Sequence, residues 1–131
     1  MVNLTLIVGS ERLVIARLNP DETLPKFEIG GFFSITKTPD EISIIISEKY
    51  VETFPEWKFE KGWRFIKVEG PLDFNLVGIL TSILNPLAKN CISIFVISTF
   101  DTDYILVKEI NLDRSIEVLK KKGFNIRILP N

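Results

Sequence analysis

The fold is decided by residues 63–129, WRFIKVEGPLDFNLVGILTSILNPLAKNCISIFVISTFDTDYILVKEINLDRSIEVLKKKGFNIRIL. Residues 63–69 alternate apolar and polar side chains, which is typical of a strand. Apolar residues then recur at helical spacing over residues 76–87, with Asp73 as the expected N-cap. Pro86 lies late in this run, and we expect it to kink the helix or to end it early.

The remainder of this stretch predicts two more strands, a second helix and a last strand. The strands are expected at residues 92–100, 104–109 and 125–129. Asn111 can cap the second helix, and Gly123 suits the left-handed position that follows a helix. The resulting order βαββαβ predicts an α+β protein with the ferredoxin-like split unit.

Residues 1–62 show strand patterns with little helical periodicity. Extended segments are expected at LTLIV, RLVIARL, FFSITK and EISIIISEK, and residues 51–62, VETFPEWKFEKG, are expected to be irregular. We therefore predict two tandem units with antiparallel sheets. The first is a helix-poor unit over residues 1–62, and the second covers residues 63–131.

A weak internal repeat relates the two units. A shift of 62 positions lays residues 35–38 on residues 97–100 and residues 44–45 on residues 106–107. Each unit would then contain the same hairpin with a polar, acidic turn. Two short apolar strands around any turn could also align in this way by chance.

Several expected strands are almost continuously apolar, as in ISIFVI, ILV and ISIII. A βαββαβ sheet carries helices on one face only, so apolar side chains on the other face need a second cover. Burial of each is worth roughly 1.5–3 kcal/mol. We expect this cover to come from the other unit, from another subunit or from both. The alternative is a sheet with a few exposed isoleucines.

Composition excludes several kinds of chemistry. The chain has no His and one Cys, so neither a Ser-His-Asp or Cys-His catalytic site nor a zinc site of His and Cys can form within it. The 16 basic residues balance 17 acidic ones, which gives no general attraction to nucleic acid or anionic membranes. We expect a cytoplasmic binding protein without targeting segment, membrane span, resident metal or cofactor, and not an enzyme.

Four motifs in the second half carry a resemblance to a known family. They are GPLDF at residues 70–74, the pair Gly78-Ile79, PLA at residues 86–88 and ISTFDTDYILV at residues 97–107. With these residues the chain resembles the ACT domain, and more narrowly the small two-ACT-unit proteins related to the CASTOR arginine sensors. In the first half the resemblance rests mainly on GGFFSITKTPDEISI at residues 30–44, which implies a degenerate ACT-like unit there.

The resemblance implies a regulatory protein that binds a free amino acid at an interface between ACT units. In the arginine sensors the ligand lies against the opening turns of the first helix and the loop between the second and third strands. Carried to this chain, that implies ligand contacts from Gly78, Ile79, Thr99, Phe100 and Asp103. A homodimer is the implied assembly.

The residue types themselves suit a zwitterion. A carboxylate binds well at a helix N-terminus, which we expect the segment with Gly70, Leu72, Asp73 and Phe74 to supply, although Asp73 could act as a cap alone. An ammonium group needs carboxylates, and Asp101 and Asp103 stand two apart in a turn, where turn chemistry alone could also place them. If the units are related by a pseudo-twofold axis, three further residues could face the ligand: Thr36, Lys37 and Thr38.

Two readings compete with ligand binding at these positions. Gly78 lies inside a helical pattern, where a glycine is less favourable than an alanine. Close approach of a ligand would explain its presence, and so would close packing of a neighbouring helix. For the whole chain, the alternative function is a structural oligomerisation protein with a vestigial pocket, whose apolar sheet face serves assembly.

Overall fold

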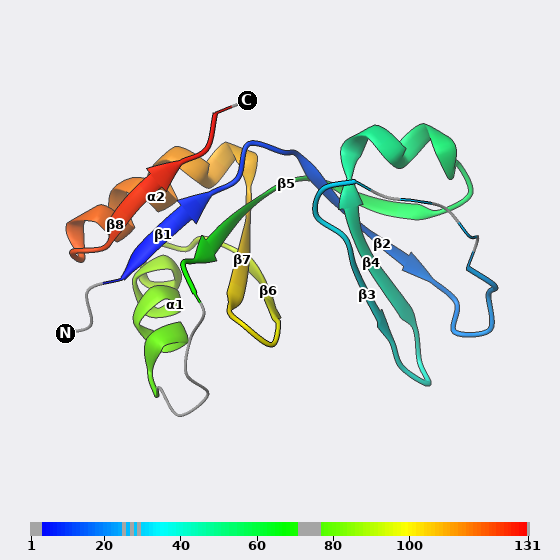
Figure 1. The fold of residues 1–131 in the computed structure, drawn as a ribbon, viewed down its shortest axis with the longest axis horizontal. Coiled ribbons are helices and arrows are strands. Elements are labelled where there is room, and N and C mark those ends of the chain that lie inside the picture. The colour runs from blue at the N-terminus through cyan, green and yellow to red at the C-terminus, as the bar shows by residue number, and fades with distance from the viewer. Residues whose placement is uncertain (1–3, 25, 27, 29, 71–76, 131) are drawn as a thin grey trace. The chain divides into compact units, whose positions relative to one another are not determined.

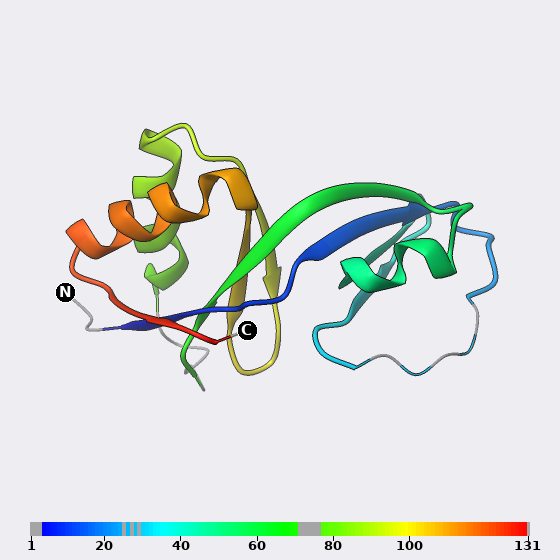
Figure 2. The ribbon, with the colours of Figure 1, turned by 90° about the horizontal axis from the view of Figure 1, so that it is seen from above.

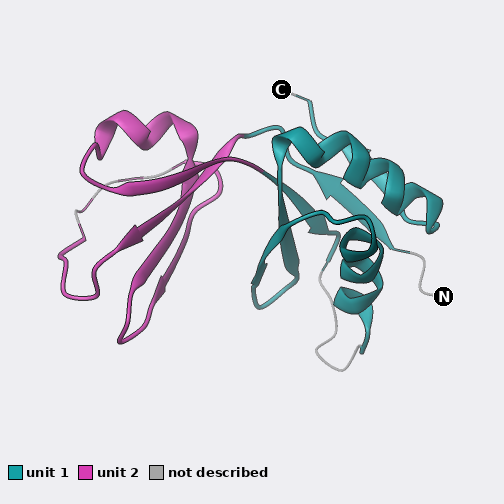
Figure 3. Ribbon diagram, turned by 180° about the vertical axis from the view of Figure 1, so that it is seen from behind, with its two compact units in different colours: residues 1–11, 64–131 teal, residues 12–63 magenta. Residues whose placement is uncertain are grey.

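The computed structural model describes residues 4–24, 26, 28, 30–70 and 77–130, which form two compact units (Figure 3). Unit 1 comprises residues 1–11 and 64–131, and unit 2 comprises residues 12–63. The expected division was residues 1–62 and 63–131. The structure differs from it at the N-terminal end, because the first strand pairs with strands of unit 1.

Unit 1 is a βαββαβ unit with one inserted strand. Its elements in chain order are β1 Thr5–Val8, the second half of β5 Lys58–Val68, α1 Ile79–Lys89, β6 Ile94–Ser98, β7 Asp103–Lys108, the 3-10 helix η2 Glu109–Asn111, α2 Leu112–Lys121 and β8 Asn125–Ile128. The strand order is β6-β7-β5-β1-β8, in which β1 runs antiparallel to β5 and parallel to β8 (Figure 1). The predicted ferredoxin-like α+β fold is confirmed.

The core of unit 1 lies between the sheet and its two helices, which cover the same face (Figure 2). Buried side chains from the sheet are Leu6, Val8, Ile66, Val68, Ile105 and Val107, and those from the helices are Ile83, Leu87, Ile116 and Leu119. Successive residues of a strand point to opposite faces. Apolar residues at every second position of the strands therefore pack against apolar residues at intervals of about 3.6 positions in the helices, and together they form one layer.

The first helix differs from its expected position. Gly78 occupies the N-cap with a φ of 82°, and α1 begins at Ile79, so the prediction that Asp73 caps this helix is wrong. A left-handed residue interrupts the right-handed helical path, which prevents the helix from starting upstream of it. The first intrahelical bond runs from the Ser82 N–H to the Gly78 carbonyl at 3.0 Å. Pro86 lies inside the helix without ending it, because α1 continues to Lys89.

Unit 2 has the strand order of the same fold with little helix. Its elements are β2 Leu13–Leu18, β3 Ser34–Lys37, β4 Ile42–Ser47, the 3-10 helix η1 Glu48–Thr53 and the first half of β5. They form an antiparallel sheet in the order β3-β4-β2-β5. The helix-poor prediction is confirmed. Residues 51–62 are not irregular throughout, because β5 begins at Lys58.

The core of unit 2 lies on one face of this sheet. It gathers aliphatic side chains from β2 and β4 and two aromatic rings that precede β5: Val14, Ala16, Leu18, Ile42, Ile44, Ile46, Phe54 and Trp57. The rings of Phe54 and Trp57 stack with centroids 4.0 Å apart and an interplanar angle of 8°. Two aromatic rings and a short 3-10 helix thus cover a face that carries two α-helices in unit 1.

The two units contain the same hairpin, as the repeat predicted, but with a different shift. In β3–β4 the Thr38 N–H donates to the Glu41 carbonyl at 2.9 Å, and in β6–β7 the Thr99 N–H donates to the Thr102 carbonyl at 2.8 Å. The threonine hydroxyl accepts an N–H in both turns, at 3.2 and 3.3 Å. Thr99 stands 61 positions after Thr38, so the shift of 62 was wrong by one residue.

The same shift of 61 aligns the elements around the turns. It pairs the starts of β4 and β7, Ile42 with Asp103, and the starts of η1 and η2, Glu48 with Glu109. Almost continuously apolar strands align nearly as well one residue out of register in sequence, and the turn hydrogen bonds distinguish the two alignments.

The face of the unit 1 sheet opposite the helices is also apolar. Alternation along the strands places Phe65, Phe95, Ile97, Tyr104 and Leu106 there, and Leu106 is fully buried. The rings of Phe65 and Tyr104 meet edge to face with centroids 5.4 Å apart. The expected second apolar face is therefore present, and the identity of its cover stays a prediction.

Candidate functional site

The β6–β7 turn carries four of the predicted ligand contacts that the structure describes: Thr99, Phe100, Asp101 and Asp103. The Thr99 hydroxyl donates to the Thr102 carbonyl at 3.1 Å and accepts the Thr102 N–H at 3.3 Å, which closes a tight turn around Phe100 and Asp101. Both of these residues are exposed, Phe100 with 79% of its surface. The turn therefore presents one aromatic ring and one carboxylate to its surroundings.

Asp103 is the first residue of β7 and is only partly exposed. Its Oδ1 accepts a hydrogen bond from the Ser98 hydroxyl at 2.5 Å, directly across the hairpin. This bond fixes the direction of the carboxylate, because one of its two oxygens is held by a residue on the neighbouring strand. A carboxylate held in this way is preorganised to accept from a cation.

Thr102 fixes the turn to the neighbouring strand. It is 5% exposed, and its hydroxyl donates to the main-chain carbonyl of Val68 at 2.5 Å. Gly70 follows Val68 by two residues, so the bond brings the turn close to that predicted contact. Sequence reasoning missed Thr102, because nothing distinguishes it from an ordinary turn threonine until β5 and β7 are paired.

Gly78 and Ile79 form the start of α1, at the same end of unit 1 as the β6–β7 turn (Figure 1). Gly78 is exposed, and a Cβ there would find no atom within 4 Å. A glycine is required at this position by the φ of 82°, and not by close packing of a helix against it. Ile79 is buried in the core of unit 1 and lies beneath the site.

The predicted contacts from unit 2 lie on the β3–β4 hairpin. Thr36, Lys37 and Thr38 are all exposed. With the shift of 61, Thr38 corresponds to Thr99 and Lys37 corresponds to Ser98. Their participation in a common site with unit 1 stays a prediction.

Three predicted contacts, Leu72, Asp73 and Phe74, lie outside the described residues. Within the described ranges, no three side chains of the His, Cys, Asp or Glu type gather as a metal ion would require. Nor does any helix in the described part of the chain have the length and apolarity to cross a membrane.

Comparison with protein families gives two matches along the chain. A family model described as the ACT domain matches residues 58–121, and a second model, described as an N-terminal domain, matches residues 11–56. The boundary between the matches falls close to the start of β5 at Lys58.

Individual proteins are similar over larger parts of the chain. The cytosolic arginine sensor for mTORC1 subunit 1 of Bos taurus is 30% identical over 108 residues, which cover 76% of this chain and 33% of the sensor. The chain thus spans about a third of the length of these arginine sensors. The crystal structure of protein Atu0741 from Agobacterium tumefaciens superposes with a TM-score of 0.90 and 33% identity, covering 100% of this chain and 97% of that one.

A more distant structure shares the fold alone. The ligand-free regulatory subunit of aspartate kinase from Thermus thermophilus superposes with a TM-score of 0.60 and 8% identity. The match covers 92% of this chain and 97% of that subunit.

Proposed function

Because the chain belongs to the ACT-domain family and is related to the CASTOR arginine sensors, we propose that it is a regulatory module that binds a free amino acid. The ligand is held at an interface between ACT units. The observation that carries the proposal is the bond between Thr102 and Val68, because it joins the β6–β7 turn to the end of β5 in unit 1.

The start of α1 suits the carboxylate of the ligand. The N–H groups in the first turn of a helix are not used by its own hydrogen bonds, and Gly78 at the N-cap has no side-chain oxygen to offer them. An anion near such an end gains roughly 0.3–1 kcal/mol from the helix dipole at an exposed site. Backbone N–H donors therefore supply the carboxylate subsite.

The β6–β7 turn suits the ammonium group and the side chain of the ligand. Asp103 carries a negative charge whose direction Ser98 fixes, and Asp101 adds a second exposed carboxylate two residues away. Phe100 supplies an apolar surface at the tip of the same turn. Thr36, Lys37 and Thr38 complete the site from a second ACT unit under this proposal.

Binding in this scheme is coupled to assembly and involves no catalysis. The active form is a cytoplasmic homodimer, and a ligand that binds only the assembled form stabilises it by about 2.7 kcal/mol at a hundredfold excess over Kd. The competing function is a structural oligomerisation module. The apolar face with Phe65 and Phe95 favours it, since both side chains are only partly buried and such a face serves assembly without any ligand.

A thermal-shift screen tests the proposal. Each of the twenty standard amino acids is added at about 10 mM, on the order of saturation for a weak site. At least one raises the melting temperature. Asp103→Asn and Phe100→Ala reduce that shift, while Asp21→Asn, which removes an exposed charge in unit 2, leaves it unchanged.

The proposal fails if no amino acid shifts the melting temperature. Sedimentation velocity then decides the alternative. A stable dimer without a ligand response supports the structural oligomerisation module, and a monomer excludes both functions.

A further inference from the structure

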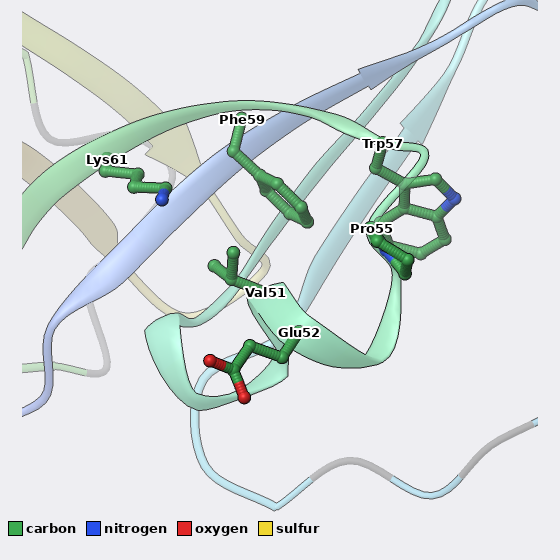
Figure 4. Close-up of a pocket in the computed structure, with 6 residues that line it drawn as sticks. All are labelled: Val51, Glu52, Pro55, Trp57, Phe59 and Lys61. Atoms are coloured by element: carbon green, nitrogen blue, oxygen red, sulfur yellow. The ribbon is translucent and has the colours of Figure 1, made fainter.

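Unit 2 has a pocket where its second helix is cut short. The shift of 61 aligns the start of η1 with the start of η2, which leads directly into the ten residues of α2 in unit 1. In unit 2 the helix ends at Thr53, and the chain turns into β5 at Lys58. A pocket of about 390 Å³ opens between η1 and β5 (Figure 4). Its lining residues are Val51, Glu52, Pro55, Trp57, Phe59 and Lys61.

The walls of this pocket are aromatic and aliphatic. Phe59 points from β5 toward η1, and Val51 points back from η1 toward β5 (Figure 4). Trp57 is 7% exposed, stacks on Phe54 and lies with its ring centroid 6.1 Å from that of Phe59. Because Phe54 supports one face of the indole, Trp57 forms a rigid wall. The volume is near the lower end of the roughly 300–1,000 Å³ range of ligand pockets, which suits a small ligand.

The two charged lining residues have opposite signs and lie toward one end. In Figure 4 the ammonium end of Lys61 and the carboxylate of Glu52 both lie on the side away from Trp57 and Pro55. Glu52 and Lys61 are exposed, whereas Trp57 is buried. The pocket therefore has an apolar inner part and a mouth with one positive and one negative group.

We propose that this pocket is a second small-molecule site, which binds an α-amino acid with an aromatic or branched apolar side chain. Such a molecule carries its ammonium and carboxylate groups at one end and its apolar group at the other. Glu52 receives the ammonium group, Lys61 receives the carboxylate, and the apolar side chain packs between Val51, Phe59 and Trp57. The pocket lies wholly within unit 2, so this site does not depend on the candidate site of unit 1.

Titration of the protein with L-phenylalanine, followed by the indole N–H signals in proton–nitrogen NMR spectra, tests the site. The chain has two Trp residues, and Trp63→Phe assigns their signals. The Trp57 signal shifts in a saturable way. Loss of one charge-assisted contact in Glu52→Gln or Lys61→Gln weakens binding about tenfold.

Matched controls use charges of the same sign beside the pocket. Glu56 lies in the turn before β5 and is replaced in Glu56→Gln. Lys58 lies on β5, where alternation places its side chain on the face opposite to those of Phe59 and Lys61, and it is replaced in Lys58→Gln. Both variants bind L-phenylalanine as the unmodified protein does. If either control weakens binding as much as Lys61→Gln does, general electrostatics explains the effect and the assignment of the two charges is overturned.

Analogues of the probe test its chemistry. Hydrocinnamate lacks the ammonium group and phenethylamine lacks the carboxylate, so each binds about tenfold more weakly than L-phenylalanine. Equal binding of either analogue overturns the zwitterion assignment. Absence of any saturable Trp57 shift overturns the site itself. Asp103→Asn separates this site from that of unit 1, because it leaves the Trp57 titration unchanged even where it reduces the thermal shift.

Discussion

The hydroxyl of Thr102 donates a hydrogen bond to the main-chain carbonyl of Val68 across 2.5 Å. Thr102 is 5% exposed, so the bond is shielded from water. Its two partners lie 34 positions apart in the chain, on either side of α1 and β6. This bond joins the β6–β7 turn to the end of β5 in unit 1.

Replacement of Thr102 tests this role. Thr102→Val keeps the shape of the side chain but leaves the buried carbonyl without that donor, and we expect the free energy of unfolding to fall by about 1–3 kcal/mol. Thr102→Ser retains the hydroxyl and loses less. Urea denaturation monitored by circular dichroism measures both changes. Equal stabilities of the Val variant and the original protein would show that the bond contributes nothing.

Gly78 is expected to be intolerant of a side chain for conformational reasons alone. Its φ is 82°, which costs a residue with a Cβ about 1–2 kcal/mol, and a Cβ there meets no atom within 4 Å. Gly78→Ala therefore lowers stability by about that amount, and Gly78→Asn by less, since Asn tolerates this conformation. Gly30→Ala is the matched control. Its Cβ also meets no atom within 4 Å, and its φ lies outside the left-handed range, so the effect should stay within about 0.5 kcal/mol.

Gly9 is expected to be intolerant for the opposite reason, which is lack of space. A Cβ at Gly9 would lie 2.3 Å from the Cε2 and Cζ atoms of Phe65, whose ring packs edge to face on Tyr104. Gly9→Ala should therefore destabilise the protein by about 1–3 kcal/mol. In a Phe65→Leu background, which lacks those ring atoms, the same change should cost less. A double-mutant cycle measured by urea unfolding checks the coupling, and strictly additive effects would refute it.

Arg64 is expected to act mainly through a backbone contact. Its Nε and Nη2 donate to the Gly9 carbonyl at 3.0 and 2.7 Å, whereas Nη1 lies 3.4 Å from Glu109 Oε1. The Arg64 side chain is 14% exposed and that of Glu109 is 37% exposed. Arg64→Met should cost about 1.5–3 kcal/mol. Glu109→Gln should cost at most about 1 kcal/mol, because a partly exposed ion pair is weak.

Salt provides the control for the Arg64 prediction. The small loss in Glu109→Gln should shrink further in 1 M NaCl, where the Debye length is about 3 Å, and the loss in Arg64→Met should persist. The free energies of unfolding of the two variants are measured by urea denaturation at each salt concentration. A loss in Glu109→Gln that matches the loss in Arg64→Met would show that the ion pair, and not the carbonyl contact, accounts for the contribution of Arg64 to stability.

The periodic parts of the chain could be predicted from sequence because they depend on short-range physical chemistry. The second helix was expected from Asn111 and runs over Leu112–Lys121, and Gly123 has the expected positive φ, 96°. The four strands of the first half also lie where alternation placed them. In these segments the local preference and the buried face agree, so that no distant contact is needed to choose the conformation.

The errors occurred where a distant partner decides the outcome. Asp73 is a good cap by residue type, but the left-handed Gly78 sets the start of α1. β5 extends back to Lys58, across the charged residues and the glycine of KFEKG at residues 58–62, because β2 offers it a pairing partner. The repeat was one residue out of register, since apolar strands tolerate such a slip until the turn hydrogen bonds of Thr38 and Thr99 fix it.

The sequence by itself determined the kind of protein: an α+β chain with a βαββαβ unit in its second half, without His, and with ACT-family motifs around one acidic turn. These features follow from side-chain periodicity, residue inventory and turn chemistry, all of which act over a few residues. Only the tertiary structure decided that β1 is inserted between β5 and β8, that Thr102 holds the turn to Val68, and that the short η1 leaves a pocket beside Trp57. Each of these depends on pairing or packing between segments far apart in the chain, whose free energy no local pattern encodes.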